Sequence, residues 1–377
     1  MIDVKKIFLF WGIFLSACTT QIAEDFSTEV KIDPQVSAAF EEVSCPAVPE
    51  REFDESVYQG PMIDTHIHIS HIPEGSFDRL FADENSSPLM GVNVKMTDYI
   101  CMMNYEGTSK VFAFFPVWEP IVDESIQLVE QVMKKYPDRF VPFIMPPDHD
   151  DRPDGFPTVE AKALEEMLAV SPGLFKGFGE IGLYARGDHG GPKGAPELPP
   201  DSERLREIYP VVREENLIVY FHLGEGQKEA FEKILDENPE INFIWHGDQL
   251  IKGSGDGQDL SMVEEILSNH SNVYYGVDEL YGDTFLIRPE VSKEEFLAHF
   301  ENSEKLLRQD WDTWKAFIEK HQDQVLWGTD RGWSLPWSLD PEVALILNDY
   351  TRAFIGGLSP EVQEKFAYGN AERLAGE

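Results

Sequence analysis

The segment Met62-Ile-Asp-Thr-His-Ile-His68 alternates apolar with polar residues and ends in a pair of histidines. Four later apolar segments also end in a residue that can bind a metal: 175–180 in Glu180, 217–222 in His222, 241–246 in His246 and 325–330 in Asp330. Imidazoles and carboxylates brought together from the ends of several strands can hold a divalent ion and activate a water on it. The five segments together predict a catalytic metal site.

The alternation of side chains along a strand predicts which residues share a face. In all five segments the candidate ligands fall on the face that carries the polar residues, and the other face is left for covering helices. The predicted inward-facing residues are Asp64, His66 and His68; Lys176, Phe178 and Glu180; Ile218, Tyr220 and His222; Asn242, Ile244 and His246; and Leu326, Gly328 and Asp330. Gly177 and Gly179 are expected to face outward, where a helix can approach closely.

The intervals between the segments fit strands 1, 4, 5, 6 and 8 of an eight-stranded α/β barrel, whose units average about 30 to 40 residues. Candidates for strands 2, 3 and 7 are 111–117, 140–145 and 272–277, and helical stretches are expected at 124–136, 158–170, 202–215 and 228–238. The predicted fold is therefore a single (β/α)8 TIM barrel. All five ligand-bearing segments end at the face where such barrels carry their active sites.

Several motifs resemble the amidohydrolase-related (amidohydrolase 2) branch of the amidohydrolase superfamily, from about Pro61 to the C-terminus. They are Asp64-Thr-His-Ile-His68, Lys134-Lys-Tyr-Pro-Asp-Arg-Phe140, the His222 and His246 segments, Leu326-Trp-Gly-Thr-Asp330 and Gly369-Asn-Ala-Glu-Arg-Leu374. The resemblance implies that His66, His68 and Asp330 bind one metal, and that Asp330 also accepts a proton during catalysis.

Glu180 decides the expected number of metals. It occupies the strand-4 position at which superfamily members with two metals place a bridging carboxylate, so a site with two ions is favoured. His222 and His246 would then bind the second ion. Alternatively, His222 joins the first ion, His246 acts as base or electrophile, and Glu180 contacts the substrate. Zinc is the expected metal, and Mn²⁺, Fe²⁺ or Ni²⁺ suit the same ligands.

The predicted activity is hydrolysis of a small ester, lactone, amide or related bond, in which Asp330 takes the proton of the attacking water. The alternative is a metal-dependent decarboxylase of an aromatic or unsaturated carboxylic acid, another activity of this branch. The formal net charge of −38 disfavours a nucleic-acid substrate, because such a surface repels phosphate. The expected partner is a small molecule.

Three loops at the predicted catalytic face are candidates for substrate binding: 184–196, 252–257 and 331–337. Arg186 and Arg331 are expected to bind a substrate carboxylate or phosphate, or else to hold their own loops. Trp333 and Trp337 are expected to form an apolar wall, or to cap the barrel.

The N-terminal residues resemble a bacterial lipoprotein signal. Lys5-Lys6 precede an apolar stretch at 7–14, and Leu15-Ser-Ala-Cys18 resembles a lipobox. This predicts a signal peptide at 1–18, lipidation of Cys18, an acidic tether at 19–58 and a barrel domain at 59–377. The resemblance implies that the protein is exported and anchored by lipid to the outer membrane, facing the periplasm or the cell surface. Cys45 and Cys101 are either a disulfide or two free thiols, and the oligomeric state, a homo-oligomer included, stays open.

Overall fold

The computed structural model describes residues 36–37, 39–40, 44–49, 56–70, 94–119, 121–147, 158–184, 197–247, 260–278, 280–282, 291–332 and 335–376. All of them belong to one compact unit, Asp33–Glu377. No helix in these ranges is long and apolar enough to cross a membrane.

Eight parallel strands form one sheet in the order of the sequence, from β1 to β8. The strands are β1 (Met62–His68), β2 (Thr108–Pro116), β3 (Phe140–Met145), β4 (Gly177–Gly182), β5 (Ile218–His222), β6 (Phe243–Trp245), β7 (Val273–Val277) and β8 (Val325–Trp327). A parallel bridge between Ile67 and Arg331 joins the first strand to the residues after the last. The sheet therefore closes on itself, and the predicted (β/α)8 barrel is confirmed.

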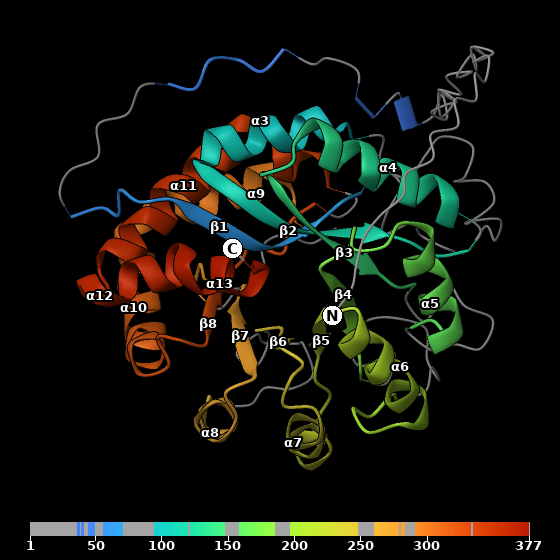
Figure 1. Ribbon diagram of the computed structural model, residues 1–377. Coiled ribbons are helices and arrows are strands. Elements are labelled where there is room, and N and C mark those ends of the chain that lie inside the picture. The colour runs from blue at the N-terminus through green and yellow to red at the C-terminus, as the bar shows by residue number, and fades with distance from the viewer. Residues whose placement is uncertain are drawn as a thin grey trace, which may run out of the picture. The chain divides into compact units, whose positions relative to one another are not determined.

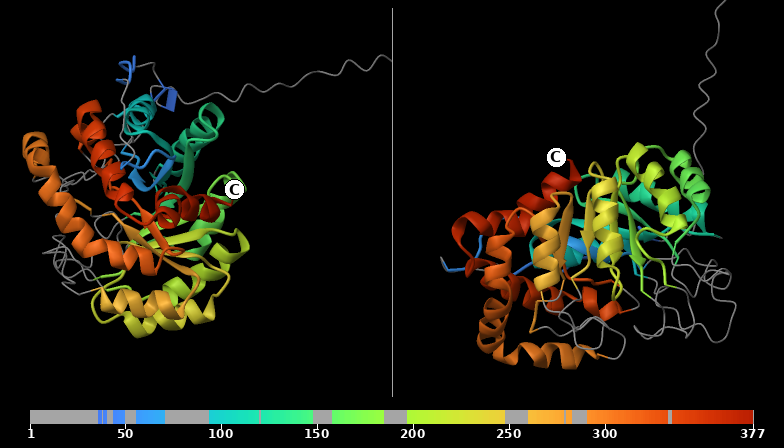
Figure 2. Two further views of the ribbon diagram at one scale, coloured as in Figure 1. Left: turned by 90° about the vertical axis from the view of Figure 1, so that its left-hand side faces the viewer. Right: turned by 90° about the horizontal axis from the view of Figure 1, so that it is seen from below.

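Helices surround the strands in all three views of the ribbon (Figures 1 and 2). They are α3 (Met96–Glu106), α4 (Val122–Lys135), α5 (Ala161–Val170), α6 (Glu203–Glu214), α7 (Lys228–Glu237), α8 (Ser261–Asn269), α9 (Lys293–His299), α10 (Ser303–Lys320), α11 (Pro341–Gly356), α12 (Pro360–Glu364) and α13 (Asn370–Ala375). Asn370 donates a hydrogen bond from Nδ2 to the carbonyl of Val325, the first residue of β8. Helix α13 therefore lies at the N-terminal ends of the strands, opposite the predicted catalytic face.

Two apolar clusters account for most of the core, and they divide as alternation requires. The larger lies between strands and helices and includes Val219, Phe243 and Trp327. The smaller fills the barrel and includes Ile218, Tyr220, Ile244 and Leu326 from β5, β6 and β8, with Ala371 and Leu374 of α13. The predicted facing of β5, β6 and β8 is therefore confirmed.

Alternation fails in β1, because this strand contains an irregularity. The pairing with β2 shifts between Asp64 and Ile67, where three steps along β1 match two along β2. Ile63 therefore packs inside the barrel, while the Asp64 carboxylate contacts Thr329 and Arg331. The prediction that Asp64 shares a face with His66 and His68 was wrong. His66 and His68 still lie on one face, as predicted.

A second irregularity reverses the prediction for β4. Pairing with β5 shifts between Phe178 and Ile181. Phe178 packs in the outer cluster, Gly177 lies against the interior ring of Phe143, and Lys176 is exposed. Alternation was therefore wrong for Lys176, Phe178 and Gly177. Glu180 still faces inward, because the extra residue of the shift restores its phase.

Part of the predicted tether packs on the barrel unit. Val36 and Ala39 are completely buried, and the carbonyl of Ala39 accepts a hydrogen bond from the backbone of Met96 at the start of α3. Cys45 forms a disulfide with Cys101 of α3. The barrel unit therefore begins before residue 59, because these residues bury side chains and cross-link to a covering helix.

Candidate metal centre and active site

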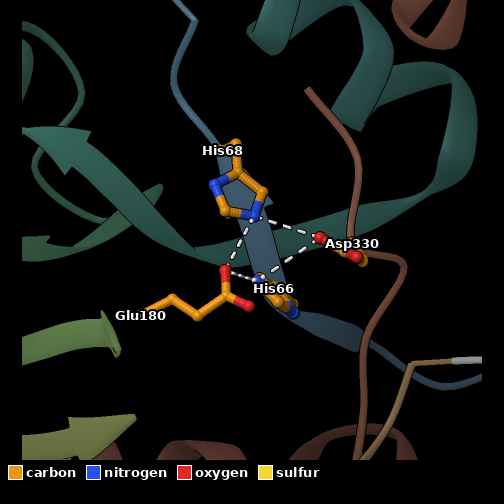
Figure 3. Close-up of side chains that lie close together, drawn as sticks. All are labelled: His66, His68, Glu180 and Asp330. Carbon is orange, nitrogen blue, oxygen red and sulfur yellow. Dashed lines mark hydrogen bonds and ion pairs between the residues drawn. The ribbon is translucent and has the colours of Figure 1, made fainter. Parts of the chain in front are cut away.

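Four predicted ligands converge at the C-terminal ends of β1, β4 and β8 (Figure 3). His68 Nε2 lies 3.2 Å from Glu180 Oε2 and 3.0 Å from Asp330 Oδ1. His66 Nε2 lies 3.3 Å and 3.5 Å from the same two oxygens. Ligands about 2.1 Å from a tetrahedrally bound ion lie about 3.4 Å from one another. The spacing of these four atoms therefore fits a single divalent ion.

The remaining two predicted histidines lie on the other side of Glu180. His222 Nε2 contacts Glu180 Oε1, and the rings of His222 and His246 lie with centroids 3.9 Å apart. Glu180, His222 and His246 form a second group whose ligand atoms lie within 4.8 Å of one another. All six predicted metal-binding residues are therefore brought together, and Glu180 belongs to both groups.

Both ring nitrogens of His246 are buried and lack a hydrogen-bond partner within the described part of the chain. Its Nε2 lies 3.7 Å from both Asp278 Oδ2 and Asp330 Oδ2. A buried imidazole without a partner is costly, and a metal ion is one group that would satisfy it. This feature, together with the ligand spacing, supports the fit of the site to a metal.

Asp278 was not predicted. It follows β7 directly and is buried against His66 and His246. The sequence contains the signal that would have found it, because Asp278 stands just after a predicted strand, as the other candidate ligands stand at strand ends. The predicted seventh segment, 272–277, ends one residue before Asp278.

The model of the amidohydrolase family matches residues 63–376 of the sequence. The chain belongs to the amidohydrolase family. Among solved structures, it is similar to a probable 2-pyrone-4,6-dicarboxylic acid hydrolase from Acinetobacter baumannii, with 15% identity, a TM-score of 0.51, and coverage of 84% of this chain and 100% of that one. An amidohydrolase from Burkholderia multivorans has 14% identity, a TM-score of 0.51, and coverage of 84% and 99%. Similarity at this level shows the fold alone. A search of curated proteins finds no match.

Membership makes this chain a metal-dependent hydrolase-type enzyme that acts on a small molecule. The charges of this amidohydrolase site fit a bound cation. Burial opposes the charged form of Glu180, but His222 and His66 outweigh it and hold the pKa of Glu180 well below its usual range. Burial likewise opposes charge on His66, but Asp330 and Glu180 keep the pKa of His66 well above its usual range. The carboxylates are thus anionic, and a divalent ion can replace the imidazole protons.

Arg331 does not face the ligand cluster, so the prediction of a substrate contact there is not supported. Its side chain is completely buried, with Nη2 2.5 Å from Glu106 Oε1 and 3.5 Å from Asp64 Oδ2, and Nε donates to Thr329. The guanidinium therefore holds α3, β1 and the end of β8 together. This is the alternative in which the arginine holds its own loop.

Of the other residues predicted near the substrate, the structure describes only Trp337. Arg186 and Trp333 lie outside the described residues of this amidohydrolase, as does Cys18. Trp337 packs against Phe296 of α9 with ring centroids 5.4 Å apart. This contact places Trp337 in the apolar layer outside the barrel.

Proposed function

We propose that this amidohydrolase binds two divalent ions, with zinc the expected metal, and hydrolyses a small ester, lactone, amide or related bond. The observation that carries this proposal is the placement of the Glu180 carboxylate. One of its oxygens lies beside the Nε2 atoms of His66 and His68, and the other contacts His222. A carboxylate that offers one oxygen to each of two ligand groups is suited to bridge two ions.

A divalent ion held by these residues would acidify a water molecule and polarise the oxygen of the bond to be broken. Asp330 is the proposed proton acceptor. Its Oδ1 lies among the ligand atoms, while its Oδ2 lies 3.7 Å from His246. A carboxylate in this position can take a proton from the attacking water and return it to the leaving group. His246, beside Asp330, is the proposed second catalytic group.

The metal content of the purified protein tests the proposal, together with products from a panel of lactones, esters, amides and carboxylic acids. Two ions per chain and a hydrolysis product are expected. One ion per chain, with release of CO2 and no hydrolysis product, would instead support the decarboxylase. A protein that binds neither Zn²⁺ nor Mn²⁺ would overturn both functions.

The substitution Glu180→Gln should lower the metal content from about two ions to about one or fewer per chain. The amide keeps the size of the side chain but loses the charge, and it offers only one oxygen. Elemental analysis measures the number of metal ions per chain. Glu166→Gln is the matched control, because the Glu166 side chain is 68% exposed on α5, and it should leave the metal content unchanged. An unchanged stoichiometry in Glu180→Gln would show that Glu180 does not bridge.

We also propose that the chain is exported and anchored through lipid at Cys18, on the strength of the lipobox-like sequence. Cys18→Ser should then abolish incorporation of a labelled fatty acid in a bacterial host. Cys45→Ser is the comparison, since it also removes one sulfur and should retain the label. Equal labelling of Cys18→Ser and the unaltered protein would contradict the proposed lipid anchor at Cys18.

A further inference from the structure

A second polar layer lies inside the barrel, on the side of His66 away from the Glu180 carboxylate. It consists of Tyr220, on the inner face of β5, and Asp278, directly after β7. Tyr220 is completely buried and Asp278 is 3% exposed. Neither residue takes part in the proposed mechanism. A buried phenol and a buried carboxylate in a barrel interior require an explanation, because burying polar groups is costly.

The two residues form a chain of contacts that ends on His66. Tyr220 donates a hydrogen bond from its hydroxyl to Asp278 Oδ2 at 3.0 Å. The same hydroxyl oxygen lies 3.0 Å from His66 Nδ1, whereas Asp278 Oδ1 lies 3.7 Å from that nitrogen, beyond hydrogen-bond distance. The Nε2 atom of His66, on the opposite side of the ring, is the one that faces Glu180 and Asp330.

The protons in this chain can be assigned from the valence of each group. A tyrosine hydroxyl has one proton, and Tyr220 gives it to the Asp278 carboxylate, which can only accept. The hydroxyl oxygen must then accept the proton of His66 Nδ1. A neutral imidazole protonated at Nδ1 carries its lone pair at Nε2. The contacts therefore select the tautomer of His66 whose Nε2 can bind a metal.

Two glycines provide the space for Asp278. A Cβ atom on Gly328 would lie 2.0 Å from Asp278 Oδ1, and one on Gly276 would lie 2.5 Å from Asp278 Oδ2. No larger residue fits at either position without moving the carboxylate. The interiors of β7 and of the end of β8 are thus shaped around this side chain, in addition to the hydrogen bonds that it makes.

We propose that Tyr220 and Asp278 are positioning residues that act in series to hold His66 in its metal-binding tautomer and orientation. The inference rests on the proposed metal site and adds to it two residues that act through His66. Partners that orient a ligand histidine in this way typically change metal affinity by about 10- to 100-fold when they are removed.

The affinity of the full-length protein for Zn²⁺, measured by competition with a chromophoric chelator, tests the proposal without an activity assay. Tyr220→Phe and Asp278→Asn should each weaken the tightest Zn²⁺ site by about 10- to 100-fold. The visible spectrum of the Co²⁺-loaded protein should change as the ligand field of His66 changes. Because the residues act in series, the double variant should bind about as weakly as the weaker single variant.

Tyr209→Phe is the matched control. It removes a buried phenol that donates a hydrogen bond to the carbonyl of Pro200, and it lies on α6. It should leave the Zn²⁺ affinity and the Co²⁺ spectrum unchanged. If Tyr220→Phe and Asp278→Asn lower only the melting temperature of the metal-free protein and bind Zn²⁺ normally, the positioning role is overturned. Failure of the unaltered protein to bind Zn²⁺ or Co²⁺ would instead overturn the proposed function itself.

Discussion

Substituting Asp330 by Asn should lower turnover by about 10²- to 10⁴-fold, the range for loss of a general base. Asn removes the proton-accepting charge but keeps the shape of the side chain. It also suits the backbone, since Asp330 has a φ of 49°, and Asn, like Asp, tolerates this left-handed region better than most residues. The measurement is kcat on whichever substrate of the panel the unaltered protein hydrolyses.

The control for this experiment is Asp236→Asn, because the Asp236 side chain is 76% exposed. It should retain full activity. The melting temperature of Asp330→Asn should stay close to that of the unaltered protein, which separates a chemical defect from unfolding. Normal turnover by Asp330→Asn would remove Asp330 as the base.

Substituting Arg331 by Met should lower the free energy of unfolding by about 3–5 kcal/mol, the usual result of removing one partner from a buried ion pair. Met fills a similar volume but leaves the carboxylates of Glu106 and Asp64 without their cation. Both side chains are completely buried. Chemical denaturation at pH 7, followed by circular dichroism, measures the loss.

The loss should be smaller at pH 5 than at pH 8. Even with Arg331 present, burial and the neighbouring Glu106 raise the pKa of Asp64 to about 7. Removing the guanidinium raises it further. A carboxyl with a raised folded-state pKa stabilises the fold at low pH and loses this contribution as the pH rises through that pKa.

Arg213→Met is the comparison for this prediction. Arg213 pairs with Glu240 at 2.7 Å, but both side chains are more than 40% exposed, and exposed pairs contribute little. It should show little or no change in stability. If Arg331→Met were as stable as the unaltered protein and instead had a raised KM, the substrate-binding role first predicted for Arg331 would be restored.

Much of the fold could be predicted because the strands carry local signals. Parallel strands covered on both faces are nearly continuous apolar runs, and the segments ending in His222, His246 and Asp330 are of this kind. Their side chains obey alternation in the structure. His66 and His68 also remain on one face, because a spacing of two within a strand does not depend on what precedes it.

Alternation could not predict the phases of β1 and β4. A bulge adds a residue to one strand of a pair, and it is defined only by the partner strand. Alternation therefore predicts the wrong faces for Asp64 and Phe178, because neither segment shows in its own sequence where its bulge lies. The sequence could not decide between the two predicted roles of Arg331 for a similar reason, since its partner Glu106 lies on α3, far away in the sequence.

The sequence by itself determined the strand order, the six candidate ligands and the end of the barrel at which they gather, because these follow from local periodicity and from residue type. Only the tertiary structure decided that the Glu180 carboxylate faces two histidine groups, that Arg331 is enclosed by carboxylates, and that Tyr220 and Asp278 support His66. Those facts depend on distances between side chains from different strands. Such distances are set by strand register and by the closure of the barrel, which no single segment encodes.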